Sequence, residues 1–454
     1  MIHLAIDIGA SSGRHILGEV RDGRLQLQEV YRFENNLKTV DGHKIWDIEN
    51  LVSQVKAGIK RCAEIGKIPD TVAIDTWAVD YVLLDEDGKE LLPVYNYRDS
   101  RTDSAVPEVE AVIPQEELYR LTGIQKQNFN TIYQLWCDKQ SGKLERAKTF
   151  LMIPEYLSYK LTGVAANEYT NASTTGMVNA ATRSWDDSII SRLGYPKILF
   201  GKLNQPGTLL GNFSKEMQDY AGFNAQVVFA PSHDTASAVV ASPLEEHGLY
   251  LSSGTWSLLG MENHTAITTE RAREANFTNE GGMEYRYRFL KNYMGMWLFQ
   301  NIRRNLDKKY SYDEMMFLAE DSSYEKTFNV NDPRLVAPDN MIDAIQQVLG
   351  ESLPLGDLLN STYHSLAASY REAVEEIESI TGRRAAAVHI VGGGCQDKYL
   401  NSLTAKYTGK PVTAGPVEAT ATGNIAAQLV YSGECADVDD ARALIRKSFS
   451  IQEV

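Results

Sequence analysis

The chain of 454 residues lacks several features that mark other classes of protein. Its four cysteines, at positions 62, 137, 395 and 435, lie far apart without a Cys-x-x-Cys pair, so neither a zinc site nor a disulfide framework is expected. No apolar run approaches the roughly 20 residues that span a bilayer. The first residues also lack the basic and apolar regions of a signal peptide. We therefore expect a cytoplasmic protein without a membrane partner.

Basic residues are also in deficit. The chain has 45 Lys and Arg against 60 Asp and Glu, which gives a net charge of −15. Such a charge repels a phosphate backbone, so nucleic acid is not an expected partner. The sequence contains neither a G-x-x-x-x-G-K-[ST] P-loop nor a protein-kinase catalytic-loop motif. Any nucleotide site must therefore be of another type.

The hydrophobic pattern predicts an α/β protein. Strands are expected over 4–8, 15–20, 25–33 and 71–76, with a helix from about 48 to 66. The order recurs after residue 245, with strands over 249–252, 256–261 and 387–391 and a helix over 361–381. An ancient duplication and a chance recurrence of α/β units both fit this repetition. At this length we expect two domains, 1–244 and 245–454, with helices and loops inserted at 103–206.

Turns of small residues follow strands at matching places in the two halves. Ala10, Ser11, Ser12, Gly13 and Arg14 come soon after Asp7, which ends a predicted strand, and Ser253-Gly254-Thr255 is the counterpart. Backbone N–H groups and hydroxyls in such a turn can approach a phosphate, while the acid can hold a hydrated metal ion. Each segment by itself could instead be an ordinary hairpin turn.

A third small-residue turn, at 392–394, is three consecutive glycines between a predicted strand and a predicted helix. Without side chains, such a turn lets a purine and its ribose lie against the backbone at a helix start. Close packing of the helix on the sheet would explain the glycines equally well.

Asp234 lies between an apolar strand over 227–230 and a helix of small residues. A carboxylate at a helix N-terminus can take a proton from a substrate hydroxyl, although Asp is also a good N-cap and His233 could be a core histidine. Polar and aromatic residues at 75–80 and 97–101 suit a sugar, whose hydroxyls need polar partners and whose carbons stack on rings. A surface cluster of ion pairs would look similar.

Taken together, these segments resemble the FGGY carbohydrate kinases over nearly the whole chain. The matching segments, in the order of the family, are 7–14, 75–80, 97–101, 169–172, 232–238, 250–257, 279–282, 290–292, 389–396 and 414–419. The resemblance implies two ribonuclease H-like α/β domains of the actin and sugar kinase type, with ATP and a sugar meeting in the interdomain cleft.

The resemblance also implies roles for individual residues. Asp234 would be the catalytic base, and Asp7 would help to place Mg2+. The sugar would be bound by Ala78, His233, Asp234, Thr235 and Asn292, and the nucleotide by Ala10, Ser11, Ser12, Gly13, Arg14, Thr255, Gln300 and Gly393. Ala78 stands where members of the family often have glycine, and its methyl group could trim the sugar pocket.

The implied activity is transfer of the γ-phosphoryl group of MgATP to a small-molecule sugar, with the C1 hydroxyl of L-rhamnulose as the expected acceptor. The enzyme would be a monomer or a homodimer. Kinases for L-fuculose, xylulose or glycerol are the alternatives within the family. A non-catalytic sugar sensor and an ATPase that drives a protein partner are the alternatives outside it. The joint presence of Asp7, Asp234 and Thr255 favours catalysis.

Overall fold

The computed structural model describes residues 1–454, which form two compact units. Unit 1 comprises Met1–Ala241, Glu262–Phe289 and Thr420–Ser448, and unit 2 comprises Ser242–Met261, Leu290–Ala419 and Phe449–Val454. The chain thus passes between the two units several times. The division into domains 1–244 and 245–454 stays a prediction.

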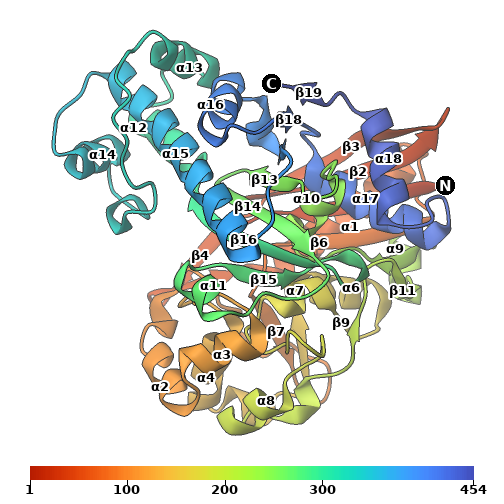
Figure 1. The fold of residues 1–454 in the computed structure, drawn as a ribbon. Helices are drawn as coiled ribbons and strands as arrows, with labels where there is room; N and C mark the ends of the chain where they lie inside the picture. The colour runs from red at the N-terminus through yellow and green to blue at the C-terminus, as the bar shows by residue number, and fades with distance from the viewer. The chain divides into compact units, whose positions relative to one another are not determined.

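Unit 1 is built on a six-stranded sheet with the order β11-β12-β6-β1-β2-β3. Figure 1 labels β2, β3, β6 and β11 of this sheet. The strands are β1 (Ile2–Ile8), β2 (Ser12–Arg21), β3 (Arg24–Glu34), β6 (Thr71–Thr76), β11 (Thr208–Asn212) and β12 (Gln226–Phe229). β1 pairs antiparallel with β2 and parallel with β6, so the predicted strand-turn-strand opening is confirmed. In the β1–β6 register Asp7 pairs with Asp75, which places both carboxyl groups on one face of adjacent strands.

Helix α1 (Ile48–Glu64) forms where its hydrophobic period predicts a helix. Leu51, Val55 and Ile59 recur on one side of the helix and are buried in the core that also contains apolar side chains of β1 and β6. Asp47 caps the helix, since its side chain accepts a hydrogen bond from the backbone N–H of Asn50 at 3.3 Å. Burial of this apolar face holds the helix against the sheet.

Helix α10 (Asp234–Ala241) follows β12 and lies very close to helix α17 (Ala419–Ser432). A Cβ atom added at Gly423 of α17 would lie 1.7 Å from the backbone oxygen of Ser237 in α10. Only glycine allows this approach. The contact therefore fixes the helix whose first residue is Asp234.

The segment expected to contain helices and loops, 103–206, is largely helical and has its own buried core, which includes Val109, Ile132 and Ile189. It holds α2 (Ala105–Val112), α3 (Gln115–Thr122), α4 (Thr131–Gln140), α5 (Lys143–Arg146), α6 (Ile153–Thr162), α7 (Tyr169–Ser173) and α8 (Asp187–Leu193), with short strands β8 (Thr149–Met152), β9 (Asn167–Glu168) and β10 (Leu203–Asn204). The remaining elements of unit 1 are β4 (Leu37–Val40), β5 (His43–Trp46), β7 (Tyr81–Leu84), α9 (Lys215–Ala221), α11 (Glu270–Glu274), β15 (Thr278–Gly281) and α18 (Val438–Ser448).

Unit 2 repeats the strand pairing of unit 1. Its strands are β13 (Leu249–Ser253), β14 (Trp256–Asn263), β17 (Val388–Val391), β18 (Val412–Ala414) and β19 (Gln452–Glu453). β13 pairs antiparallel with β14 and parallel with β17, β17 pairs parallel with β18, and β18 pairs antiparallel with β19. In unit 1 the pairings follow the same order, antiparallel, parallel, parallel and antiparallel, along the strands β2, β1, β6, β12 and β11. This match supports the duplication that the sequence left open.

The helices of unit 2 are α12 (Trp297–Asn305), α13 (Tyr312–Glu320), α14 (Met341–Leu349), α15 (Leu355–Thr381) and α16 (Lys398–Thr408), and strand β16 (Tyr287–Met294) leads into α12. Helix α15 begins six residues before the predicted start at 361. Its first turn follows Pro354 and contains Gly356, a poor helix former, so local propensity hides this turn.

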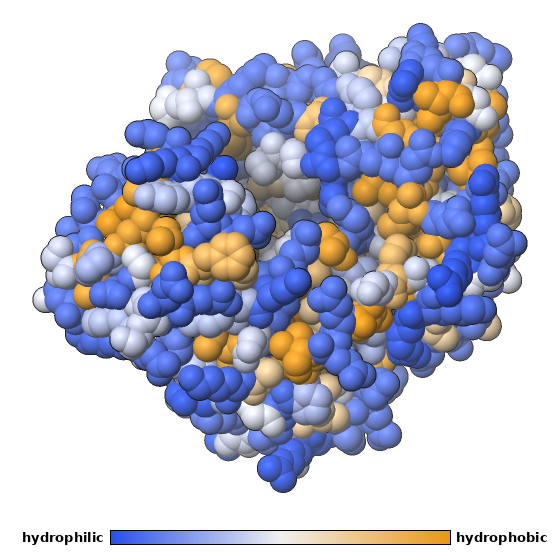
Figure 2. All heavy atoms as spheres, turned by 90° about the horizontal axis from the view of Figure 1, so that it is seen from above, coloured by the Kyte–Doolittle hydropathy of each residue, from blue (hydrophilic) through white to orange (hydrophobic).

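The face of the molecule drawn in Figure 2 consists mostly of atoms of hydrophilic residues, with apolar atoms in scattered groups. None of the helices is both long enough and apolar enough to cross a membrane.

The contact at Gly423 leads to a test of packing. We expect Gly423→Ala to destabilise the protein by at least about 2 kcal/mol, because overpacking a rigid contact costs roughly 1–3 kcal/mol. The measurement is chemical unfolding followed by circular dichroism. Gly201→Ala is the control, since a Cβ there meets nothing within 4 Å and its backbone φ is not positive. Equal stability of the two variants would contradict the packing argument.

Candidate active site

Asp234 occupies the N-terminus of α10. Its Oδ1 accepts the backbone N–H of Thr235 at 2.6 Å, and its side chain remains 27% exposed. Burial raises the pKa of Asp234 to about 6. The carboxylate is therefore ionised and accessible at neutral pH, with a higher proton affinity than an ordinary aspartate, as a general base requires.

Buried hydrogen bonds hold the loop that precedes Asp234. The backbone N–H of Thr76, at the end of β6, donates to the carbonyl of Ser232 at 2.9 Å. The buried carboxylate of Glu168 accepts from the Ser232 hydroxyl at 2.7 Å, and the Asn171 amide donates to the Ser232 carbonyl at 3.2 Å. The end of β6 and the segment 168–171 thus both fix the position of Asp234.

A pair of carboxyl groups lies at the ends of β1 and β6. Asp7 accepts from Nη2 of Arg14 at 2.7 Å. Asp75 is fully buried, its Oδ2 accepts from the Asn424 amide at 2.6 Å, and its Oδ1 has no hydrogen-bond partner. Burial and the neighbouring Asp7 raise the pKa of Asp75 well above its usual range. Of the pair, Asp75 is thus the carboxyl group whose burial most disfavours its charged form.

A chain of buried side chains continues from Asp75 across the unit. Gln428 donates to Oδ1 of Asn424 at 2.8 Å and accepts from the hydroxyl of Thr71 at 2.5 Å. Thr71 lies 2.7 Å from Nδ1 of His3, whose pKa is lowered by burial. These bonds join α17 to β1 and β6 through polar groups in the core, so they fix which residues of α17 face Asp75.

The turn between β6 and β7 presents Ala78, which is half-buried. Val79 has φ +66°, a strained value for a β-branched residue, and the N–H of Asp80 donates to the Ala78 carbonyl at 2.9 Å. The carboxylate of Asp80 accepts the indole N–H groups of Trp46 at 2.6 Å and Trp77 at 3.0 Å. Asp80 therefore serves to shape the turn, a role that was not among the alternatives considered from the sequence, and its burial excludes it from a surface cluster of ion pairs.

The turn at 9–13 is held by backbone and side-chain hydrogen bonds. The N–H of Gly9 donates to the carbonyl of Ser12 at 2.9 Å, and the side chain of Asn35 donates to the carbonyl of Gly9 at 3.0 Å. Ser11 at its tip is exposed, whereas Gly13 lies against the ring of Phe33 with no room for a side chain. Unit 1 thus brings the predicted residues 10–14 next to Asp7 on a single hairpin.

Unit 2 groups most of the remaining predicted residues around the end of β13. The carbonyl of Thr255 accepts from the N–H of Trp297, the first residue of α12, at 3.1 Å, and α12 carries Gln300. A Cβ at Gly394 would lie 2.0 Å from Oγ of Ser253, so the glycine turn lies directly on this strand end. Gly393 itself is exposed.

Asn292 lies apart from these contacts. It is half-buried on β16, between the ion-paired Lys291 and the buried Tyr293.

Two residues beside Asp234 were assigned no role from the sequence. Arg288 of β16 is fully buried and donates to the hydroxyl of Thr235 at 2.8 Å and to Nδ1 of His233 at 3.1 Å. Its charge is balanced by Glu280 of β15, whose Oε2 accepts from Nη2 at 2.9 Å. The available signal was one arginine within the otherwise apolar stretch Tyr287–Leu290, since an unpaired charge is not buried in a strand.

No group of three or more His, Cys, Asp or Glu side chains in residues 1–454 could hold a metal ion by itself. This fits Mg2+, which usually keeps several waters and is bound through one or two carboxylates plus substrate phosphates. The carboxylate of Asp7 beside the turn at 9–13 is a donor of this kind.

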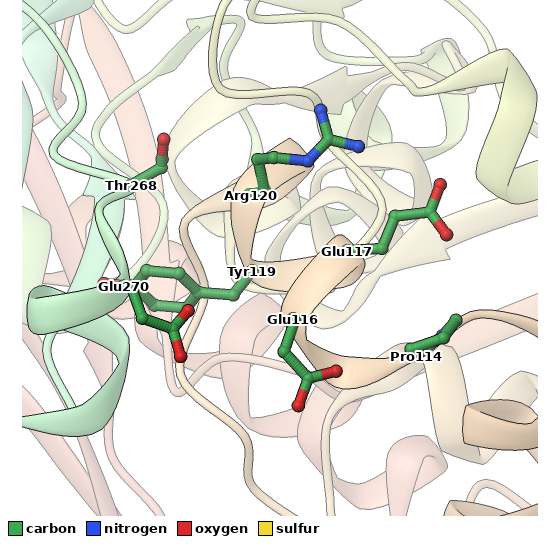
Figure 3. Close-up of a pocket in the computed structure, with 7 residues that line it drawn as sticks. All are labelled: Pro114, Glu116, Glu117, Tyr119, Arg120, Thr268 and Glu270. Atoms are coloured by element: carbon green, nitrogen blue, oxygen red, sulfur yellow. The ribbon is translucent and has the colours of Figure 1, made fainter.

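A surface pocket lies elsewhere in unit 1, between α3 and the segment around α11 (Figure 3). It is lined by Pro114, Glu116, Glu117, Tyr119, Arg120, Thr268 and Glu270. None of the residues predicted to act in catalysis or binding is among them.

Comparison with known proteins identifies the class of this chain. Residues 2–241 match the N-terminal domain of the FGGY family of carbohydrate kinases, and residues 249–432 match its C-terminal domain. The chain belongs to the FGGY family of carbohydrate kinases, as predicted, and the family implies ATP as the phosphoryl donor.

Relatives and solved structures extend this result. The chain is similar to the rhamnulokinase of Halalkalibacterium halodurans, with 47% identity over 99% of this chain and 97% of that protein, and to the rhamnulokinase of Bacillus subtilis, with 42% identity over 100% and 95%. Ligand-bound xylulose kinase from Lactobacillus acidophilus matches with a TM-score of 0.84 at 15% identity, covering 100% of this chain and 92% of that one. Plasmodium falciparum glycerol kinase with ADP gives 0.80 at 15%, covering 99% and 93%. These two structures confirm the predicted fold.

The raised pKa of Asp75 leads to a prediction about stability and pH. A raised pKa in the folded state means that folding takes up a proton above about pH 4, so stability falls as the pH rises from there towards the folded pKa. Asp75→Asn has no such proton to take up, so it removes this loss of stability at higher pH. The new side chain can still accept the hydrogen bond from Asn424. We expect the melting temperature of the variant, relative to the wild type, to be higher at pH 8 than at pH 5. The exposed Asp87→Asn is the control, and a difference that does not change with pH would contradict the assignment.

Proposed function

We propose that the enzyme transfers the γ-phosphoryl group of MgATP to the C1 hydroxyl of L-rhamnulose, giving L-rhamnulose 1-phosphate and ADP, in the breakdown of L-rhamnose. The observation that carries the reaction type is Asp234, a partly exposed carboxylate at a helix start with a pKa of about 6. The choice of sugar is supported by the relatives, which are rhamnulokinases of nearly the same length.

In the proposed reaction, Asp234 accepts the proton of the C1 hydroxyl while that oxygen attacks the γ-phosphorus. The new bond joins the C1 oxygen to phosphorus, and the bond between the γ-phosphorus and the β,γ-bridging oxygen breaks. Bound Mg2+ would neutralise charge on the phosphate oxygens, with Asp7 helping to hold it. ADP leaves as the second product, and Asp234 later releases its proton to water.

The other assigned residues would position the two substrates. Ala78, His233, Thr235 and Asn292 would contact the sugar. The turn at 10–14 together with Thr255, Gln300 and Gly393 would contact the nucleotide. Phosphoryl transfer depends mostly on positioning and charge neutralisation, so these contacts would supply much of the rate enhancement.

A sugar panel tests the proposed function. We expect the purified enzyme with MgATP to release ADP much faster with L-rhamnulose than with L-fuculose, L-xylulose, D-xylulose, L-ribulose or glycerol. A coupled assay for ADP measures kcat/KM for each sugar. Preference for another sugar would show that L-rhamnulose is not the substrate, and Ala78→Gly would then be the first variant to examine. No sugar-stimulated ADP release from folded enzyme that binds ATP would refute the kinase assignment.

Substitution of the proposed base tests the mechanism. We expect Asp234→Asn to lower kcat by at least about 100-fold while ATP binding is retained, because general-base catalysis contributes about 10²–10⁴-fold. In the wild type, kcat/KM for the sugar should fall as the pH drops through about 6, where Asp234 becomes protonated. Near-normal turnover of the variant would exclude Asp234 as the base.

A further inference from the structure

The guanidinium group of Arg288 reaches both neighbours of the proposed base. Nη1 donates to Oγ1 of Thr235 at 2.8 Å, and Nη2 donates to Nδ1 of His233 at 3.1 Å. Nη2 also donates to Oε2 of Glu280 at 2.9 Å. Arg288 has no exposed surface, so solvent does not compete for these bonds. Asp234 thus lies between His233 and Thr235, whose side chains are both bound by the rigid, planar guanidinium group of Arg288.

The direction of these hydrogen bonds follows from the chemistry of arginine. A guanidinium group donates and never accepts, so Nδ1 of His233 and Oγ1 of Thr235 must both be acceptors. A His233 ring that accepts at Nδ1 carries its proton on Nε2, which lies 3.0 Å from Oγ1 of Thr235. The hydroxyl oxygen of Thr235 can then accept from both Arg288 and His233, so its own proton is left to donate, while the carboxylate of Asp234 accepts.

We propose that Arg288 is a positioning residue that determines which side chains of the sugar subsite donate hydrogen bonds and which accept them. Through Arg288 and His233, the hydroxyl of Thr235 is directed to donate to a sugar oxygen, and Asp234 remains the acceptor for the hydroxyl that reacts. Glu280 balances the buried charge and keeps the guanidinium group in this orientation. The inference rests on the proposed function, because it assumes that the residues around Asp234 bind the sugar.

The variant Arg288→Lys tests the geometry of Arg288 separately from its charge. Arg288→Lys keeps the positive charge but cannot bridge His233 and Thr235 with one planar group. We expect the KM for L-rhamnulose to rise at least about tenfold, the effect of losing one hydrogen bond to a charged group. The KM for ATP should stay within about twofold, because Arg288 contacts none of the residues assigned to the nucleotide.

Arg442 provides a matched control. It is 2% exposed, donates to the carbonyls of Val239 and Val240 near the end of α10, and pairs with Glu262 at 2.9 Å. Arg442→Lys also disturbs a buried arginine, one that lies on α18 and contacts α10 at the end away from Asp234. We expect a lower melting temperature with an unchanged KM for the sugar. An equal rise of the sugar KM in both variants would show that Arg288 has only a structural role.

A measurement on the wild type covers the case in which the lysine variant does not fold. ¹⁵N NMR of the histidine rings, with His233→Asn to assign the signal, should show Nδ1 without a proton and Nε2 with one at pH 7.5. A protonated Nδ1 would overturn the inference, as would a wild-type sugar KM in folded Arg288→Lys.

The failure of the proposed function would be distinguishable from the failure of this inference. If the wild type prefers another sugar of the panel, the proposed substrate is wrong, and the KM comparison is made with that sugar. If no sugar is turned over, the kinase assignment fails and the inference about a sugar subsite fails with it.

Discussion

The close contact between helices α10 and α17 at Gly423 is the constraint on which the site in unit 1 depends. It allows the backbone of α17 to lie against Ser237, and it brings Asn424, the next residue, within 2.6 Å of Asp75. At the other end of α10, Arg442 donates to the carbonyls of Val239 and Val240. The helix that begins with Asp234 is therefore held at its middle and near its end, and its N-terminus has little freedom to move.

This rigidity lets the protein keep several acidic groups close together in different environments. Asp7 is paired with Arg14, and Asp75 is buried beside Asn424 with a pKa that burial and the neighbouring Asp7 raise. Asp234 has a pKa of about 6 because it is largely removed from water. Three ionised carboxylates would repel one another, and the raised pKa of Asp75 reduces this repulsion by favouring its uncharged form. The carboxylates of Asp7 and Asp234 can therefore lie in the same region at a lower electrostatic cost.

Much of the fold could be predicted from the sequence because the hydrophobic period is a local property. The strand over 71–76 and the helix that begins at 48 form as predicted, since each buries one continuous apolar pattern. The start of α15 was misjudged because Gly356 weakens the local signal while packing keeps the turn helical. The family resemblance identified Asp234 and the turn at 10–14, and the structure places them at the start of α10 and between β1 and β2.

The sequence by itself therefore determined the class of protein, the order of its strands and helices, and the candidate base, because these are encoded in short contiguous segments. Only the tertiary structure decided that the pKa of Asp75 is raised, that Asp80 anchors two indole rings, and that Arg288 spans both neighbours of Asp234. Asn424 and Asp75 are 349 positions apart, and Arg288 and His233 are 55 positions apart. Burial and hydrogen bonding between such distant segments arise when the chain folds, so no local pattern of residues records them.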